Sequence, residues 1–166
     1  MAKPMHLHLR GNPPAPPLLR PRILAARDDA MGSQSADRQL PRILVVEDDY
    51  LVSSEIETEL LAAGFDVVGI ATSAQEAVRL ALSEQPSLIV MDIRLEGDRD
   101  GVDAALAIFK ATGIRCLFAS AHHDPETRRR AEPCEPLGWL AKPFTMRALV
   151  LEVRQDLKGP GPERKG

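Results

Sequence analysis

Several features that would indicate other kinds of protein are missing from this chain of 166 residues. It has only two cysteines, Cys116 and Cys134, which form no disulfide framework and match no metal-ligand spacing, so we expect free thiols. The formal net charge is -3, and no block of lysine and arginine accompanies it. A protein whose main partner is nucleic acid usually carries such a block, so we expect no nucleic-acid partner.

Long apolar runs are missing too. No stretch approaches the roughly 20 residues that a membrane span requires. Prolines interrupt the N-terminal region, which therefore lacks the continuous apolar core of a secretory signal peptide. These absences predict a soluble, cytoplasmic protein with no membrane partner.

Proline density and composition divide the chain into three parts. Residues 1–39 are predicted to be a disordered Pro-rich N-terminal extension, because proline fixes φ and removes a backbone donor. Residues 40–158 have the length and apolar content to bury the core of one domain. Residues 159–166 consist mainly of glycine, proline and charged residues, and we expect a flexible tail.

Within residues 40–158, short apolar runs alternate with amphipathic segments. The apolar runs predict buried strands, at 42–46, 65–71, 88–91, 115–119 and 137–141. Most segments between them show the apolar stripe of a helix. The exception follows Ser120, where Glu126 to Arg130 supplies no such stripe. Five alternations predict a parallel sheet with helices on both faces, because parallel strands need long crossovers.

Polar residues directly follow four of the expected strands. They are Glu47 and Asp48, then Asp92, then Ser120, and finally Lys142. The carboxyl ends of parallel strands share one edge of the sheet, where open α/β sheets bind their ligands. A single aspartate in such a place is more often a cap than a functional group. Three acids, a hydroxyl and an amine along one edge make coincidence a poor explanation.

The residue types at this edge suggest a chemistry. Carboxylates held close together repel one another and raise one another's pKa unless a cation intervenes. Mg²⁺ suits a few carboxylates, whereas softer metals lack cysteine and histidine ligands here. Beside Mg²⁺, Asp92 would be a nucleophile toward a phosphoryl group. Lys142 would add a positive charge, and the Ser120 hydroxyl could donate to a phosphoryl oxygen.

These residues, in this order and with these gaps, resemble the receiver domain of response regulators of two-component signalling. The resemblance runs from about Pro41 to Leu157. It implies a doubly wound, five-stranded parallel sheet of order 2-1-3-4-5, the flavodoxin-like receiver fold. It also implies that Asp92 is the phosphoacceptor, and that the phosphoryl donor is a histidine kinase or a phosphotransfer protein.

The resemblance further implies a metal site and one unusual peptide bond. Asp48, Asp92 and the backbone carbonyl of Arg94 would bind Mg²⁺, with Glu47 acting partly through water. The bond between Lys142 and Pro143 would be cis, which is uncommon enough to be a direct test.

Signalling in such domains involves a hydroxyl residue and an aromatic residue, which correspond here to Ser120 and Trp139. A downstream protein would bind the face formed by the fourth helix, fifth strand and fifth helix. The alternative for Trp139 is simple packing against the fourth helix. The segment Phe118 to Ala121 resembles a Phe-Ala-Thr-Gly signature subfamily that often works with HWE-type kinases, although Ser120 replaces its threonine.

The chain ends shortly after the last expected helix, so we expect a stand-alone receiver rather than an enzyme. It would act by protein contact, by phosphorelay or as a phosphate sink. One alternative is a phosphohydrolase of the haloacid dehalogenase type, which would need a second aspartate where Arg94 stands. Another is a receiver-fold adaptor that binds its partner without phosphorylation of Asp92.

Overall fold

The computed structural model describes residues 39–122 and 124–158. The predicted N-terminal extension, apart from Gln39, and the predicted tail lie outside these ranges. The elements alternate between strand and helix along the chain: β1 Arg42–Val46, α1 Tyr50–Ala62, β2 Asp66–Ala71, α2 Ala74–Glu84, β3 Leu88–Met91, α3 Gly101–Thr112, β4 Cys116–Ser120, α4 Pro125–Ala131, the 3₁₀ turn η1 Glu132–Cys134, β5 Gly138–Ala141 and α5 Met146–Leu157.

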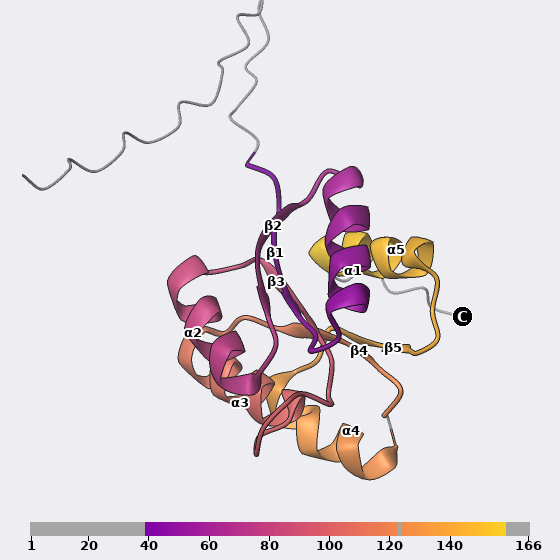
Figure 1. Ribbon diagram of the computed structural model, residues 1–166. Helices are drawn as coiled ribbons and strands as arrows, with labels where there is room; N and C mark the ends of the chain where they lie inside the picture. The colour runs from indigo at the N-terminus through magenta and orange to yellow at the C-terminus, as the bar shows by residue number, and fades with distance from the viewer. Residues whose placement is uncertain (1–38, 123, 159–166) are drawn as a thin grey trace, which may run out of the picture. The chain divides into compact units, whose positions relative to one another are not determined.

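The strands form one parallel sheet in the order β2-β1-β3-β4-β5. Helices α1 and α5 cover one face, and α2 and α3 cover the other, with α4 beside them near the β4–β5 edge (Figure 1). The predicted fold class and strand order are therefore confirmed. Three strands begin one residue later than predicted. At β2 the reason is that the Phe65 N–H bonds back to the Leu60 carbonyl at 3.1 Å, closing the end of α1.

The three inner strands, β1, β3 and β4, are buried almost throughout, because helices cover both faces of the sheet. This explains why they are continuous apolar runs. Successive residues of a strand point to opposite faces. In β1, Ile43 and Val45 pack with α1 and α5, whereas Leu44 and Val46 pack in the cluster under α2 and α3. The two cysteines also belong to the second cluster, and both are buried, free thiols, as expected.

Each of the five α-helices begins at a side chain that accepts hydrogen bonds from backbone N–H groups of its first turn, the usual device for satisfying those donors. These caps are Asp49, Ser73, Asp100, Asp124 and Thr145. Ser73 and the Glu76 three residues later have the residue types of a reciprocal capping box. The Ser73 half is present, but the Glu76 carboxylate accepts from Thr72 N–H at 3.2 Å instead.

Helix α4 is short and docks without an apolar stripe, as its sequence indicated. Ala131 is its one buried residue. From the same helix, the Arg128 guanidinium lies 4.9 Å above the ring of Trp139. That ring in turn stacks on Phe118 of β4, with 4.6 Å between ring centroids. Trp139 is therefore a packed residue in this structure, and its role as a switch stays a prediction.

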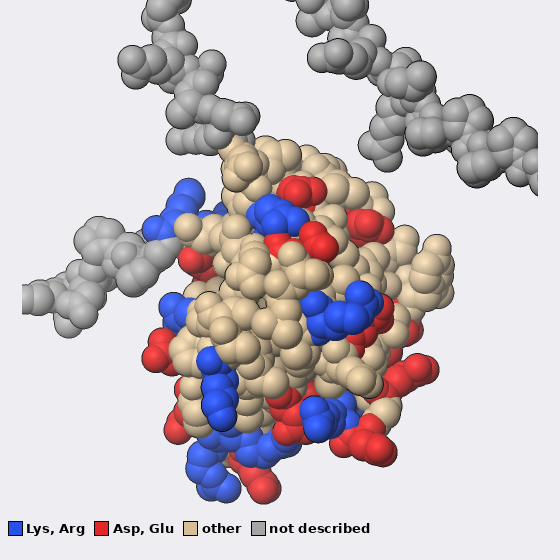
Figure 2. Space-filling model, turned by 90° about the vertical axis from the view of Figure 1, so that its left-hand side faces the viewer, with Lys and Arg blue, Asp and Glu red and all other residues tan. Residues whose placement is uncertain are grey.

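Charges of both signs are interspersed over the face shown in Figure 2. Ion pairs among the described residues include Arg42 with Glu84 at 2.9 Å and Arg79 with Glu76 at 3.1 Å. Within the described ranges, no helix has both the length and the apolar character needed to cross a bilayer.

Candidate functional site

Asp92 stands at the carboxyl end of the central strand β3, which is buried along its whole length. Its N–H donates to the Val46 carbonyl at 2.9 Å, so the adjacent strand fixes its backbone. One carboxylate oxygen, Oδ1, accepts from the N–H groups of Ile93 at 2.6 Å and Arg94 at 3.2 Å. The residue is only 7% exposed, and its second oxygen, Oδ2, accepts no hydrogen bond from these two N–H groups.

Three acids follow β1, and the fold uses them differently. Glu47 is buried, and its N–H continues the sheet by donating to the Ala71 carbonyl at 2.9 Å. Asp48 is exposed. Asp49 caps α1 by accepting from Leu51 N–H at 2.8 Å. A hard cation with oxygen ligands is suited to the remaining pair plus Asp92.

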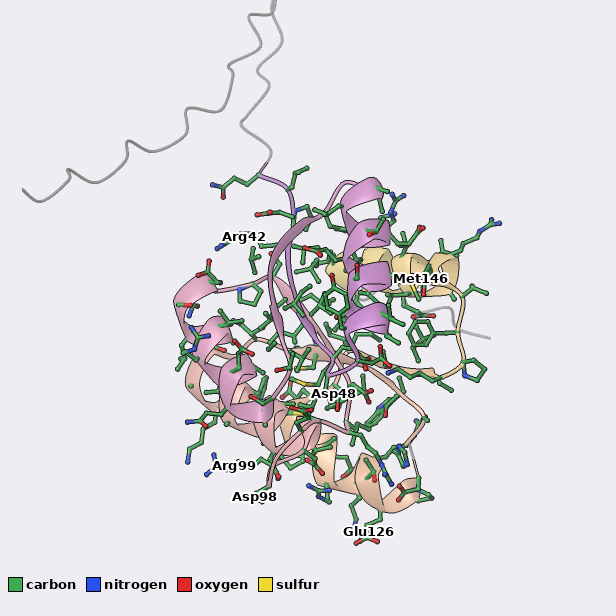
Figure 3. The ribbon with its side chains drawn as sticks, viewed as in Figure 1. Arg42, Asp48, Asp98, Arg99, Glu126 and Met146 are labelled. Atoms are coloured by element: carbon green, nitrogen blue, oxygen red, sulfur yellow. The ribbon has the colours of Figure 1, made fainter. Side chains whose placement is uncertain are left out.

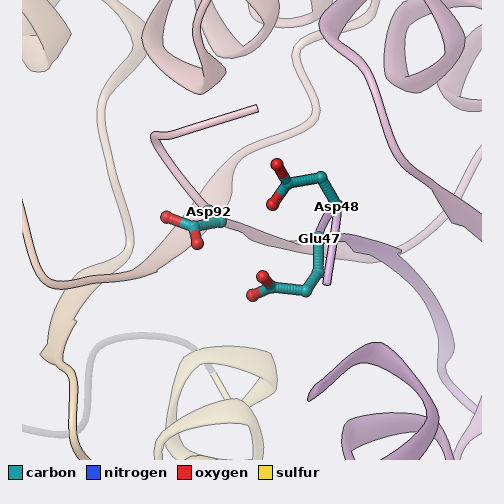
Figure 4. Close-up of side chains that lie close together, drawn as sticks. All are labelled: Glu47, Asp48 and Asp92. Atoms are coloured by element: carbon teal, nitrogen blue, oxygen red, sulfur yellow. The ribbon is translucent and has the colours of Figure 1, made fainter. Parts of the chain in front are cut away.

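One carboxylate oxygen from each of Glu47, Asp48 and Asp92 lies within 4.8 Å of the other two. Figure 4 shows the three side chains converging from the ends of two neighbouring strands. Hard, negatively charged oxygens at this spacing fit Mg²⁺, and the exposed Asp48 leaves one side of the cluster open to solvent. The donor set therefore fits the metal that the sequence suggested.

Lys142 reaches into this cluster from the end of β5. Its Nζ lies 2.5 Å from Glu47 Oε2 and 2.6 Å from Asp92 Oδ2. Burial raises the pKa of Glu47; the hydrogen bond from Lys142 opposes that rise only in part. Burial alone would lower the pKa of Lys142, but its bonds to Asp92 and Glu47 prevail and raise it. The predicted cis bond between Lys142 and Pro143 is confirmed.

Ser120 ends β4 and is 2% exposed. Its hydroxyl oxygen accepts from the His122 N–H at 3.2 Å, in the turn that leads to α4. Trp139, three residues before Lys142, belongs to the apolar cluster under α2–α4 rather than to the carboxylate cluster. The fold thus brings Glu47, Asp92 and Lys142 into direct contact, whereas Ser120 and Trp139 lie on the side toward α4.

A groove of about 380 Å³ lies between the loop after β3 and the loop after β4, at the carboxyl edge of the sheet. Arg94, Asp98 and Arg99 line it from one loop, and His122 and Asp124 from the other. Figure 3 shows Asp98 and Arg99 at the same end of the sheet as Asp48.

One residue at this site was missed by the sequence analysis. A Cβ on Gly101, the first residue of α3, would lie 1.9 Å from the Asp92 carbonyl oxygen. The helix therefore begins in contact with the backbone of Asp92, and only glycine fits there. The one signal in the sequence was a glycine directly after an aspartate that could cap a helix.

The family model for the response regulator receiver domain matches residues 43–154. This chain belongs to that family. Apart from Arg42, the match covers all residues of the strands β1 to β5, together with the site residues Glu47, Asp48, Asp92, Ser120 and Lys142. As a receiver domain, the chain is part of phosphorylation-based two-component signalling and is related to regulators rather than to classical enzymes.

Relatives of the receiver include two named regulators. The transcriptional regulatory protein PdtaR of Mycobacterium tuberculosis is 33% identical over 116 residues, covering 69% of this chain and 56% of PdtaR. The phyllosphere-induced regulator PhyR of Methylorubrum extorquens is 33% identical over 130 residues, covering 78% of this chain and 48% of PhyR. The chain spans about half the length of these relatives.

Solved structures agree with this assignment. The signal receiver domain of a modulated diguanylate cyclase from Desulfovibrio desulfuricans matches with a TM-score of 0.66 and 33% identity, over 72% of this chain and 94% of that one. The N-terminal domain of a response regulator/sensory box/GGDEF protein from Carboxydothermus hydrogenoformans matches with a TM-score of 0.63 and 32% identity, over 70% and 94% of the two chains.

Proposed function

We propose that this receiver accepts a phosphoryl group on Asp92 from the phosphohistidine of a histidine kinase or phosphotransfer protein. Asp92 Oδ2 attacks phosphorus, the phosphorus–nitrogen bond breaks, and its electron pair returns to the imidazole of the donor. The observation that carries the proposal is the position of Asp92: buried, with Oδ2 2.6 Å from Lys142 Nζ and two further acids within 4.8 Å.

Glu47, Asp48, Asp92 and the backbone carbonyl of Arg94 would hold Mg²⁺. When bound, the ion neutralises charge on the phosphoryl oxygens. Lys142 bridges Glu47 and Asp92 before transfer, so its ammonium already lies where a phosphoryl oxygen arrives. Fixed positive charge of this kind stabilises the transition state without reorganisation. The Ser120 hydroxyl would donate to a second phosphoryl oxygen.

The receiver domain proper is proposed to span residues 40–158, and its signal to leave through α4, β5 and α5. Downstream, it would act by protein contact, by phosphorelay or as a phosphate sink. Ser120 and Trp139 are the proposed switch residues, since the Trp139 ring contacts both β4, through Phe118, and α4, through Arg128. An HWE-type kinase as donor, and membership of the Phe-Ala-Thr-Gly subfamily, stay predictions from the sequence around Phe118.

The test is intact-mass analysis after incubation with acetyl phosphate and Mg²⁺. We expect wild type to gain one phosphoryl group and Asp92→Asn to gain none. Omitting Mg²⁺ should abolish the gain. A wild type that stays unlabelled, while another receiver labels in parallel, would disprove the proposal and favour an adaptor that works without phosphorylation.

A further inference from the structure

We propose that Arg130, on α4, is a positioning residue for the phosphoryl acceptor Asp92, acting through the first turn of α3. The inference rests on the proposed function of Asp92 and adds a residue to that site. Arg130 lies 38 positions from Asp92 in the sequence and does not contact it. The connection between them runs through contacts that the structure gives one by one.

The first connection is between Asp92 and the start of α3. The Gly101 N–H donates to the Ile93 carbonyl at 2.7 Å. Space for a Cβ on Gly101 is closed by the Asp92 carbonyl oxygen, 1.9 Å away. The start of α3 therefore packs closely against the backbone of Asp92, and a shift away would lengthen the bond to Ile93. A displacement of the first turn of α3 would thus act on the backbone of Asp92.

The second connection is the capping box of α3. Asp100 Oδ1 accepts from Asp103 N–H at 3.0 Å, and Asp103 Oδ2 accepts from Asp100 N–H at 3.3 Å. Both carboxylates favour the N-terminus of a helix, but side by side they repel each other. The geometry of this turn depends on a cation that neutralises them.

Arg130 supplies that cation from α4. Its Nη1 lies 2.9 Å from Asp100 Oδ2, and its Nη2 lies 3.2 Å from Asp100 Oδ1 and 3.3 Å from Asp103 Oδ1. A guanidinium can hold both oxygens of one carboxylate in a single plane, which a lysine ammonium cannot. The pairing is therefore directional and holds Asp100 in one orientation.

Two arginines connect helix α4 to neighbouring elements. It has seven residues, one of them buried, and Arg128 engages the Trp139 ring on β5. Arg130 thus ties α4 to α3 while Arg128 lies over β5. If α4 shifts, the Arg130–Asp100 ion pair displaces Asp100, and Gly101 transmits that displacement to the backbone of Asp92. Conversely, a change in the backbone of Asp92 would displace α4 through the same contacts.

The neighbouring Arg129 is a matched control. It lies exposed on the same helix, and within residues 39–122 and 124–158 it makes no ion pair. Arg130→Ala and Arg129→Ala remove the same side chain and the same charge from adjacent positions. Asp100→Asn keeps an acceptor for the cap and removes the charge that Arg130 pairs with.

The experiment measures two quantities on the full chain: the rate at which acetyl phosphate with Mg²⁺ labels Asp92, and hydrogen exchange at the Gly101 amide. Arg130→Ala should slow labelling about fivefold, the factor that a well-aligned but partly exposed ion pair can supply. It should also speed exchange at Gly101 while leaving the amide of Val45 in β1 unchanged. A variant that merely lowers overall stability would speed both amides.

Arg129→Ala should match wild type in both measurements. The double variant Arg130→Ala/Asp100→Asn should be no slower than Arg130→Ala alone, because both changes remove one interaction. Equal labelling and equal Gly101 exchange in Arg130→Ala and Arg129→Ala would overturn the inference. Exchange needs no phosphoryl donor, so a wild type that fails to label would overturn the proposed function, while Gly101 exchange still decides whether Arg130 acts on the acceptor backbone.

Discussion

Acidic residues at the two edges of the sheet differ in whether a hydrogen-bond donor contacts them. At the carboxyl edge, Glu47 and Asp92 share the ammonium of Lys142 at 2.5 and 2.6 Å. At the amino edge, a groove of about 830 Å³ contains one carboxylate from the end of α5, Asp156. Its Oδ2 is buried, and no donor within the described residues reaches it. Figure 3 shows the two edges, with Arg42 near one and Asp48 at the other.

The difference shows what makes an acidic residue a candidate for chemistry. Burial raises the pKa of both Glu47 and Asp156. Only at the carboxyl edge do strand ends from β1, β3 and β5 bring further acids and a cation to the same point. A raised pKa at a single residue reports desolvation, whereas the convergence of several strand ends reports a site. Three variants separate these situations, described from the largest expected effect to the smallest.

Lys142→Met should have the largest effect. It leaves Glu47 and Asp92 facing each other without their shared cation, and breaking a buried pair costs about 3 kcal/mol. We expect the free energy of unfolding in urea to fall by that order without Mg²⁺, and millimolar Mg²⁺ to restore part of it. Labelling of Asp92 by acetyl phosphate should fall as well. Adding Glu47→Gln should recover stability but not labelling; an unchanged midpoint in the single variant would contradict the pairing.

Gly101→Ala should have the next largest effect. Its Cβ would overlap the Asp92 carbonyl oxygen, which lies 1.9 Å from the Cβ position, and overpacking of this kind costs about 2 kcal/mol. The unfolding temperature and the rate of Asp92 labelling should both fall. Gly69→Ala is the control, because its nearest neighbour is a flexible end of Leu80, 3.3 Å away. Equal losses in the two variants would show that the contact with Asp92 has no special weight.

Asp156→Asn should have the smallest effect, and it should raise the free energy of unfolding rather than lower it. Burial raises the pKa of Asp156, and the Glu152 charge adds to the rise while Arg115 opposes it. The folded state therefore holds this proton more tightly than the unfolded state, and stability from the neutral carboxyl is lost as pH rises through the folded pKa. At pH 7 the asparagine variant should be more stable, by less than about 1 kcal/mol because the group is partly exposed.

The same substitution should bring no gain near the ordinary aspartate pKa of 3.8, where wild type is protonated as well. Urea midpoints at the two pH values check this. Asp98→Asn, at an exposed acid near the other edge, is the control for replacing an aspartate by asparagine. An equal gain at pH 7 in both variants would show that the burial of Asp156 is not the cause.

The fold followed from the sequence because its signals were local and agreed with one another. Runs such as Ile43 to Val46 had to be strands buried on both faces, and parallel strands had to bring Asp92 and Lys142 to one edge. Side-chain partners did not follow. That Lys142 would hold Glu47 and Asp92 together, or that Arg130 would reach Asp100, depends on register and helix placement, which periodicity does not encode. Asp49 shows the same limit: the sequence alone does not tell which of three adjacent acids caps α1 and which belong to the carboxylate cluster.

The two buried cysteines can report separately on local and global opening of this domain. Burial raises the pKa of Cys116 and Cys134, so almost no thiolate is available to an alkylating reagent while the fold is closed. Cys134 lies in η1, directly after α4, whereas Cys116 begins the interior strand β4. Detachment of α4 would therefore expose Cys134 while Cys116 stays buried, and an alkylating reagent would then label Cys134 first. The ratio of alkylated Cys134 to alkylated Cys116 would measure how often α4 detaches without unfolding of the sheet.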